Sequence, residues 1–182
     1  MASLDDIVTH IERLALVIRS VHLKRVLTAL NERPRVNFWR LIYGNLLDVA
    51  VLEWCKVFGS DTEPTHWKRV VHDQEQFRID LLRHLGIDKR TWADYWQQMK
   101  GYRDSKVAHH WDLETVDSYP ELTLALESSY FYYEYLIKEL RRNGDTRFPD
   151  DICAYCGRYI EQAKDIAGAA LAATACFVES VD

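Results

Sequence analysis

The chain has 182 residues, the size of one domain, and its 23 Lys and Arg against 28 Asp and Glu give a net charge of −5. Hydrophobic residues make up 48% of it and aromatic residues 12%, which is enough for a buried core and excludes an intrinsically disordered chain. Seven Gly and four Pro are too few for the closely spaced turns of an all-β fold, so the composition favours helices. The mild acidity argues against a protein that coats nucleic acid through charge alone, although it leaves room for a local basic site.

Secreted and membrane-spanning proteins do not fit this sequence either. The first residues, MASLDDIVTHIERL, carry acidic side chains where a signal peptide needs basic ones. The longest nearly apolar run, 166–178, is too short for a membrane span, which needs about 20 residues. The four Cys do not form a disulfide framework in a chain of this size, which is typical of a reducing compartment. We therefore expect a cytoplasmic protein with no membrane partner.

Apolar residues spaced by three and four positions predict helices along almost the whole chain. The predicted helices span 3–31, 36–58, 64–72, 73–85, 88 to at least 99, 118–142 and 149–180. Gly59 and Gly86 stand where helix C-terminal caps belong. The sequence Ser118-Tyr-Pro-Glu121 is typical of a capping box with Pro in the first turn, and it predicts where the sixth helix begins.

The helices are expected to form one domain that covers residues 1–182. No repeat, low-complexity linker or change of composition marks a second domain. The predicted fold is all-α, a single antiparallel bundle of four to five main helices with short extra helices. The N-terminal helix within 1–33 is expected to pack against the C-terminal helix within 149–182, whose Ala and Gly residues allow a close approach.

The segment 102–110, with the sequence YRDSKVAHH, concentrates the groups that could carry chemistry. At 100° per residue, Arg103, Lys106 and His110 continue the aromatic face of the helix that begins at Asp88. Charges that follow such a face must be paired, reach solvent at a helix end, or face a partner. A cation held beside an imidazole can bind an oxyanion and transfer a proton near neutral pH, and a phosphodiester is the obvious ligand.

Arg103-Asp104 followed by His109 resembles the signature of the HEPN superfamily of small helical proteins, an Arg, a polar residue and a His four to six residues after the Arg. The Ala108-His109 ending is similar to the abortive-infection AbiU-type branch, as are segment 38–59 and the segment from Trp92 into the motif. The resemblance covers roughly residues 35–140. It implies a helical bundle that forms a homodimer with the motif helices facing each other.

Many HEPN proteins are endoribonucleases that need no metal or other cofactor, so the resemblance implies cleavage of RNA to a 2′,3′-cyclic phosphate and a 5′-hydroxyl. His109 would then help to deprotonate the ribose 2′-hydroxyl or to protonate the leaving oxygen. Arg103 would hold the scissile phosphate, and Asp104 would orient one of these two residues. Lys106 and His110 would bind the substrate beside them. Other members are toxins paired with an antitoxin protein, or modules that bind RNA, a nucleotide or a protein partner without catalysis. A module that binds RNA, a nucleotide or a protein partner without catalysis is therefore the alternative function.

Geometry limits how the motif could work. In a continuous helix through 101–110, Arg103 and His109 point about 120° apart, and Arg103 and His110 are separated by roughly 10 Å along the axis. Neither pair converges on one phosphate. A site built from two protomers, or a helix that ends near Ala108, would resolve this, and His109 is preferred over His110 only because it fits the family pattern. An Arg and a His on one helix more often belong to surface or interface salt bridges than to a catalytic site. The motif could therefore instead merely seal a dimer interface.

Three further groups of residues invite a functional interpretation. Glu53 lies on the apolar stripe of the helix 36–58, where Arg103 or Lys106 could pair with it and make it an orienting group; a buried structural ion pair is the better account. Its substitution by Ala is expected to cost about 2–4 kcal/mol in the free energy of unfolding if a cation is left unpaired.

Cys153 and Cys156 lack the further ligands of a metal site. The aromatic run 130–135 could stack on bases, but core packing explains it better.

Overall fold

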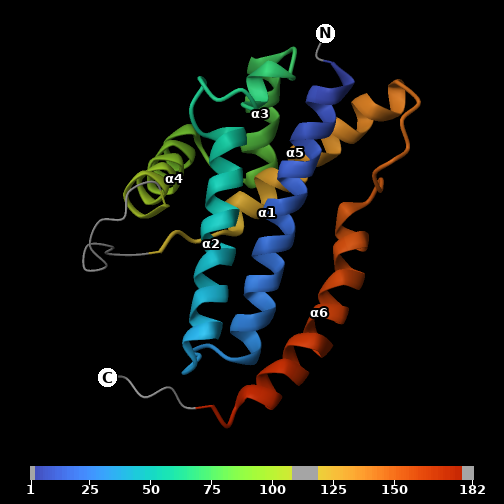
Figure 1. Cartoon of the computed structure of the whole chain (residues 1–182). Helices are drawn as coiled ribbons and strands as arrows, with labels where there is room; N and C mark the ends of the chain where they lie inside the picture. Colours follow the sequence, from blue (N-terminus) through green and yellow to red (C-terminus); the bar gives the residue numbers. More distant parts are fainter. Residues whose placement is uncertain (1–2, 108–118, 178–182) are drawn as a thin grey trace.

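The computed structural model describes residues 3–107 and 119–177, apart from the side chains of 106 and 107, and all regular elements within these ranges are helical (Figure 1). In chain order the elements are α1 (Leu4–Leu30), α2 (Asn37–Phe58), the short 3₁₀ turn η1 (Trp67–Arg69), α3 (Gln74–Leu85), α4 (Lys89–Tyr102), the π-helical segment η2 (Arg103–Val107), α5 (Thr123–Arg142) and α6 (Ile152–Thr174). The predicted all-α helical bundle is therefore confirmed. None of the described helices combines the length and the apolar character that crossing a membrane requires.

Helix α1 lies in the middle of the bundle, where it contacts α2, α5 and α6 (Figure 1). It begins at Ser3, whose hydroxyl accepts a hydrogen bond from the Asp6 N–H at 3.1 Å, while the Asp6 carboxylate accepts one from the Ser3 N–H. Apolar side chains at three- and four-residue spacing are buried against these neighbours: Ile7, Ile11, Leu14, Ile18 and Val21. Helix α6 buries Ala163, a residue small enough to let the helix lie close to its partners.

Trp54 of α2 forms the aromatic centre of the core. Its side chain is completely buried, and its ring centroid lies 5.4 Å from that of Phe58, 5.7 Å from that of Trp92 and 5.6 Å from that of Tyr95. The Trp54 indole N–H also donates to the Ser128 hydroxyl of α5 at 3.0 Å. One side chain therefore joins α2, α4 and α5, and it provides both apolar burial and a satisfied hydrogen bond.

The predicted helix boundaries hold for α1, α2 and α3 to within about a residue, but not for all the others. The short helix predicted over 64–72 is reduced to the turn at 67–69. The last helix begins at Ile152, three residues later than predicted, because the Asp151 side chain accepts from the Ala154 N–H at 2.8 Å and caps it there. It ends at Thr174, before the predicted boundary at 180.

The capping box predicted at residues 118–121 does not begin α5. Position 118 lies outside the described residues, and the helix starts at Thr123. The reason is a contact from another helix: the Tyr95 hydroxyl donates to the carbonyl of Glu121 at 2.9 Å and accepts from the N–H of Ala125 at 3.1 Å. The Glu121 carboxylate in turn accepts from the Thr123 N–H at 2.7 Å. Tertiary hydrogen bonds therefore fix the start of this helix.

Two of the histidines that the structure describes are buried, and each has a polar partner. Nδ1 of His10 lies 2.7 Å from the hydroxyl of Tyr132, and both side chains are inside the core. Nε2 of His66, in the segment after α2, lies 3.3 Å from a carboxylate oxygen of Asp61. Burial lowers the pKa of each imidazole from 6.5 to about 4, although Asp6 acts in the opposite direction on His10 and Asp61 does so on His66.

These two imidazoles should make the fold sensitive to mild acid. Their folded-state pKa values lie below 6.5, so the unfolded chain binds protons more readily, and stability is complete above that pH and falls as pH drops towards 4. The expected loss in the free energy of unfolding is about 3 kcal/mol for each imidazole. Urea titrations followed by circular dichroism across this window should show that His10→Asn reduces the fall, while His66 and His22, whose pKa burial also lowers, keep the remainder. His84→Asn, at an exposed position on α3, is the control; a wild-type slope in His10→Asn would contradict this account.

Candidate functional site

The motif segment begins where α4 changes its helical form. The chain is α-helical through Tyr102 and then continues as the π-helical segment η2. Tyr102 is buried, and its hydroxyl donates to the Asp48 carboxylate of α2 at 2.7 Å, which ties this point to the bundle. The Ser105 hydroxyl donates to the Gly101 carbonyl at 2.7 Å. Such local π turns are often found at functional sites, and this one ends the continuous α-helix on which the geometric objection to the motif depended.

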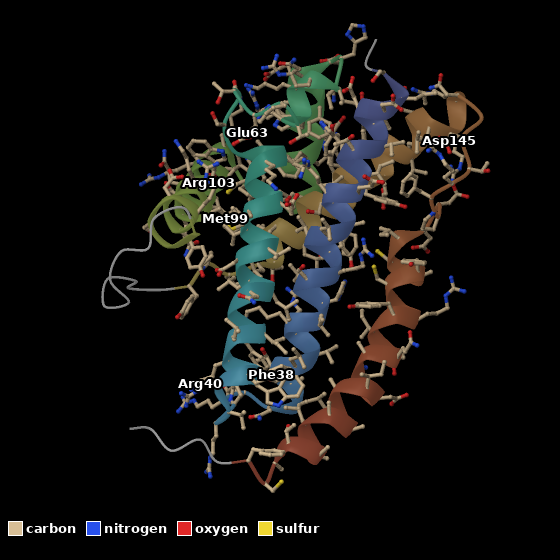
Figure 2. The ribbon with its side chains drawn as sticks, viewed as in Figure 1. Phe38, Arg40, Glu63, Met99, Arg103 and Asp145 are labelled. Atoms are coloured by element: carbon tan, nitrogen blue, oxygen red, sulfur yellow. The ribbon has the colours of Figure 1, made fainter. Side chains whose placement is uncertain are left out.

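Arg103 extends from the end of α4 beside the segment after α2, towards Glu63 (Figure 2). Its Nε and Nη2 atoms both lie 2.8 Å from a carboxylate oxygen of Asp104, and Nη1 lies 3.8 Å from a carboxylate oxygen of Glu63. The side chain is 18% exposed. It follows the fully buried Met99 on the same face of the helix, as the sequence predicted. The structure therefore places a shielded guanidinium at the first position of the motif, oriented by two acids.

The structure brings together only part of the predicted site. Arg103 and Asp104 are neighbours in contact, whereas His109 and His110 lie outside the described residues. The backbone at Lys106 belongs to η2, but its side chain is not described. The roles assigned to these three residues therefore stay predictions. Glu63, which the sequence did not single out, joins the site because the segment between α2 and α3 passes beside α4.

Glu53 belongs to a different network. Its carboxylate lies 2.7 Å from Nη1 of Arg13 and 2.5 Å from Nζ of Lys56, and its side chain is 12% exposed. Arg103 is not among these partners, and the structural ion pair that the sequence favoured is what the structure holds, while the Lys106 side chain is not described. The reason that Arg103 is not a partner is helical geometry. The charge of Arg103 acts on Cys55, which is two residues further along α2. Two residues correspond to a rotation of about 200°, so Cys55 and Glu53 lie on different sides of the helix and Arg103 is on the side of Cys55.

The surroundings of Arg103 are apolar on the α2 side. Cys55 is completely buried, and this burial raises the pKa of its thiol to about 12, although the Arg103 charge acts in the opposite direction. Cys55 is therefore a packing residue and not a nucleophile. Cys153 is exposed and Cys156 is buried, and neither has a disulfide partner. Within 3–107 and 119–177, no three His, Cys, Asp or Glu side chains are arranged to hold a metal ion.

The described arrangement can hold an anion without a metal. A guanidinium that is partly shielded from water and fixed by Asp104 binds an oxyanion more strongly than a freely moving surface cation. No family model, curated protein or solved structure matches this chain. The function must therefore be inferred from the motif and from the geometry around Arg103.

The Glu53 network leads to a prediction about stability. Glu53→Ala should leave the charges of Arg13 and Lys56 without their acceptor, but both cations are more than a quarter exposed, so water can solvate them in part. We expect the free energy of unfolding to fall by about 2 kcal/mol, at the lower end of the range for a broken buried pair.

Glu161→Ala provides the matched control. This carboxylate accepts from Lys164 one turn along α6, but the pair is exposed, so its loss should cost less than about 0.5 kcal/mol. Urea denaturation of the two variants measures both values. A cost for Glu53→Ala as small as that of the control would show that the Arg13–Glu53 pair contributes nothing to stability.

Proposed function

We propose that this protein is a cytoplasmic, metal-independent endoribonuclease of HEPN type that acts as a homodimer, in the setting of a toxin with an antitoxin partner or of phage defence. The observation that carries the proposal is Arg103, a partly shielded guanidinium held by Asp104 at the point where the α-helix of α4 ends. This is the first position of the Arg-polar-His pattern, and His109 follows it in the sequence. The resemblance to the AbiU-type branch supports the same function.

The proposed reaction needs only the groups of the motif. The ribose 2′-oxygen forms a bond to phosphorus while the bond from phosphorus to the 5′-oxygen breaks, which leaves a 2′,3′-cyclic phosphate and a 5′-hydroxyl. His109 accepts the proton of the 2′-hydroxyl, or in protonated form donates one to the leaving oxygen. Arg103 neutralises the charge that develops on the phosphate oxygens, and Asp104 orients the guanidinium. No water molecule is consumed, and no redox step is needed.

Substrate binding must compete with the acids around Arg103. Asp104 holds the Nε side of the guanidinium at 2.8 Å, whereas the Glu63 contact at 3.8 Å is longer than a hydrogen bond. A phosphate oxygen can therefore replace Glu63 at Nη1 while Asp104 keeps the guanidinium oriented. The second function is a module that binds RNA, a nucleotide or a protein without catalysis; the two acids favour it because they reduce the positive charge that Arg103 can offer to a transition state.

The nuclease proposal predicts cleavage of single-stranded RNA of mixed sequence in EDTA, with cyclic-phosphate ends detected by mass spectrometry. Arg103→Ala should reduce the cleavage rate by about 100- to 1,000-fold. His109→Ala should reduce it by a factor of about 100 to 10,000, and His110→Ala should have a smaller effect. Arg158→Ala, which removes an exposed Arg on α6, is the control. Intact RNA in every condition would overturn the proposal, and RNA binding without cleavage would support the second function.

The composite dimer can be tested with the same two variants. In a mixed dimer of Arg103→Ala and His109→Ala chains, a site that takes Arg from one protomer and His from the other keeps one intact pair. Mixing equal amounts should therefore restore about a quarter of the wild-type rate, because half of the dimers are mixed and each has one complete site. No recovery after subunit exchange would show that each site lies within one protomer.

A further inference from the structure

A groove with a volume of 390 Å³ lies between α4 and the segment that follows α2. Its lining includes Trp92, Trp96 and Gln97 from α4, Lys68 from η1 and Arg78 from α3. This volume is within the range of small-molecule sites, which is about 300–1,000 Å³. The groove combines exposed aromatic surface with cations, a combination that the proposed reaction does not use.

The indole of Trp96 is fixed in one orientation. Its Nε1 donates to the carbonyl of Phe58 at 2.8 Å and to that of Gly59 at 3.1 Å, at the end of α2. These carbonyls point towards α4 because the chain turns tightly at Gly59, where a Cβ atom would lie 2.2 Å from the Cys55 carbonyl oxygen. Trp96 is only partly buried. A fixed indole that is open to the groove can stack on a planar ring with little loss of side-chain entropy.

Two cations line the same groove as Trp96. Lys68 and Arg78 both line the groove, and each lies 5.9 Å from the ring centroid of Trp67. Asp61 pairs with Lys68, and Glu75 pairs with Arg78 at 3.4 Å, so an anion binds here by displacing these carboxylates from the two cations. A ligand that offers a planar ring and a neighbouring anion matches this arrangement, and a nucleotide unit of a single strand has both.

The groove lies along α4 about two helical turns before Arg103. Trp96, Lys100 and Arg103 are spaced by four and three residues along α4 and its π-helical extension, so they lie on one side of it. Nζ of Lys100 lies 5.2 Å from the ring centroid of Trp96. Glu63, which lies near Arg103 in Figure 2, belongs to the same segment between α2 and α3 as Asp61 of the groove lining.

We propose that this groove binds one unpaired base of an RNA strand, which stacks on Trp96 while Lys68 and Arg78 hold an adjacent phosphate. The strand then follows α4 past Lys100 to Arg103, where the scissile phosphate binds. The inference rests on the proposed function for its choice of RNA. It adds a base-binding position that is separate from the groups that perform the cleavage.

The test uses a fluorescein-labelled 2′-O-methyl RNA of mixed sequence, which lacks the attacking hydroxyl and cannot be cleaved, so binding is measured without turnover. Trp96→Leu should weaken binding about 5- to 150-fold through the loss of stacking, whereas Trp96→Phe keeps an aromatic face and most of the affinity. Lys68→Gln should reduce the slope of log K against log salt by about 0.7. Phe38→Leu and Lys164→Gln, an exposed aromatic residue and an exposed Lys elsewhere on the surface, are the matched controls.

A second measurement keeps the wild-type chain, because Trp96→Leu removes a donor from the end of α2 and could disturb the fold. RNA that carries 5-bromouridine is cross-linked by light, and the adduct is located by mass spectrometry. We expect it on the peptide that contains Trp92 and Trp96. Adducts only elsewhere, or an affinity that Trp96→Leu leaves unchanged, would show that Trp96 only closes the end of α2 and would overturn the inference.

The two proposals fail in different ways. If ordinary RNA stays intact but the 2′-O-methyl strand binds in a Trp96-dependent manner, the nuclease function falls and the base-binding groove stands. If ordinary RNA is cleaved with the same KM in wild type and Trp96→Leu, the nuclease function stands and the groove proposal falls. Failure of the 2′-O-methyl strand to bind at all would also overturn the groove proposal.

Discussion

Trp54 is completely buried where α2, α4 and α5 meet, and the position of the candidate site depends on this packing. Its ring contacts hold the face of α4 that carries Trp92 and Tyr95 against α2. Because a helix is rigid over this length, fixing that face also fixes the direction in which Arg103 leaves the far end of α4. The Tyr102 hydroxyl, bonded to Asp48, secures the same helix one residue before the motif.

The segment between α2 and α3 occupies the space that this packing leaves beside α4. It leaves α2 at Gly59, whose carbonyl accepts from the Trp96 indole together with that of Phe58, the last residue of α2. It then brings Glu63 to Arg103. Its later part buries His66, which pairs with Asp61. A loop with this many fixed contacts behaves as part of the scaffold, and it can form a binding wall without ordering when a ligand arrives.

Sequence periodicity was sufficient to predict the helices and to place Glu53 in the interior, because the spacing of apolar residues reports which side of a helix faces inward. It did not report which neighbour the side faces, so the partner of Glu53 proved to be Arg13 and not Arg103. The start of α5 was wrong for a related reason, since Tyr95 of another helix supplies its hydrogen bonds. The pairing of Glu63 with Arg103 depends on the path of a loop, and no local pattern encodes it.

The charge of the chain constrains how an RNA strand would reach this site. With a net charge of −5, the molecule as a whole repels a polyanion, and salt screens fields beyond about 8–10 Å at physiological ionic strength. Attraction must therefore come from cations that lie close together, and α4 with its opposite wall provides Lys68, Arg78, Lys100 and Arg103 along one path. Asp61, Glu63, Glu75 and Asp104 weaken the field of these cations, but Asp61 and Asp104 also hold Lys68 and Arg103 in defined positions before the strand arrives. Such pre-ordering reduces the entropy lost on binding, so an acidic protein can form a local RNA site without a large basic surface.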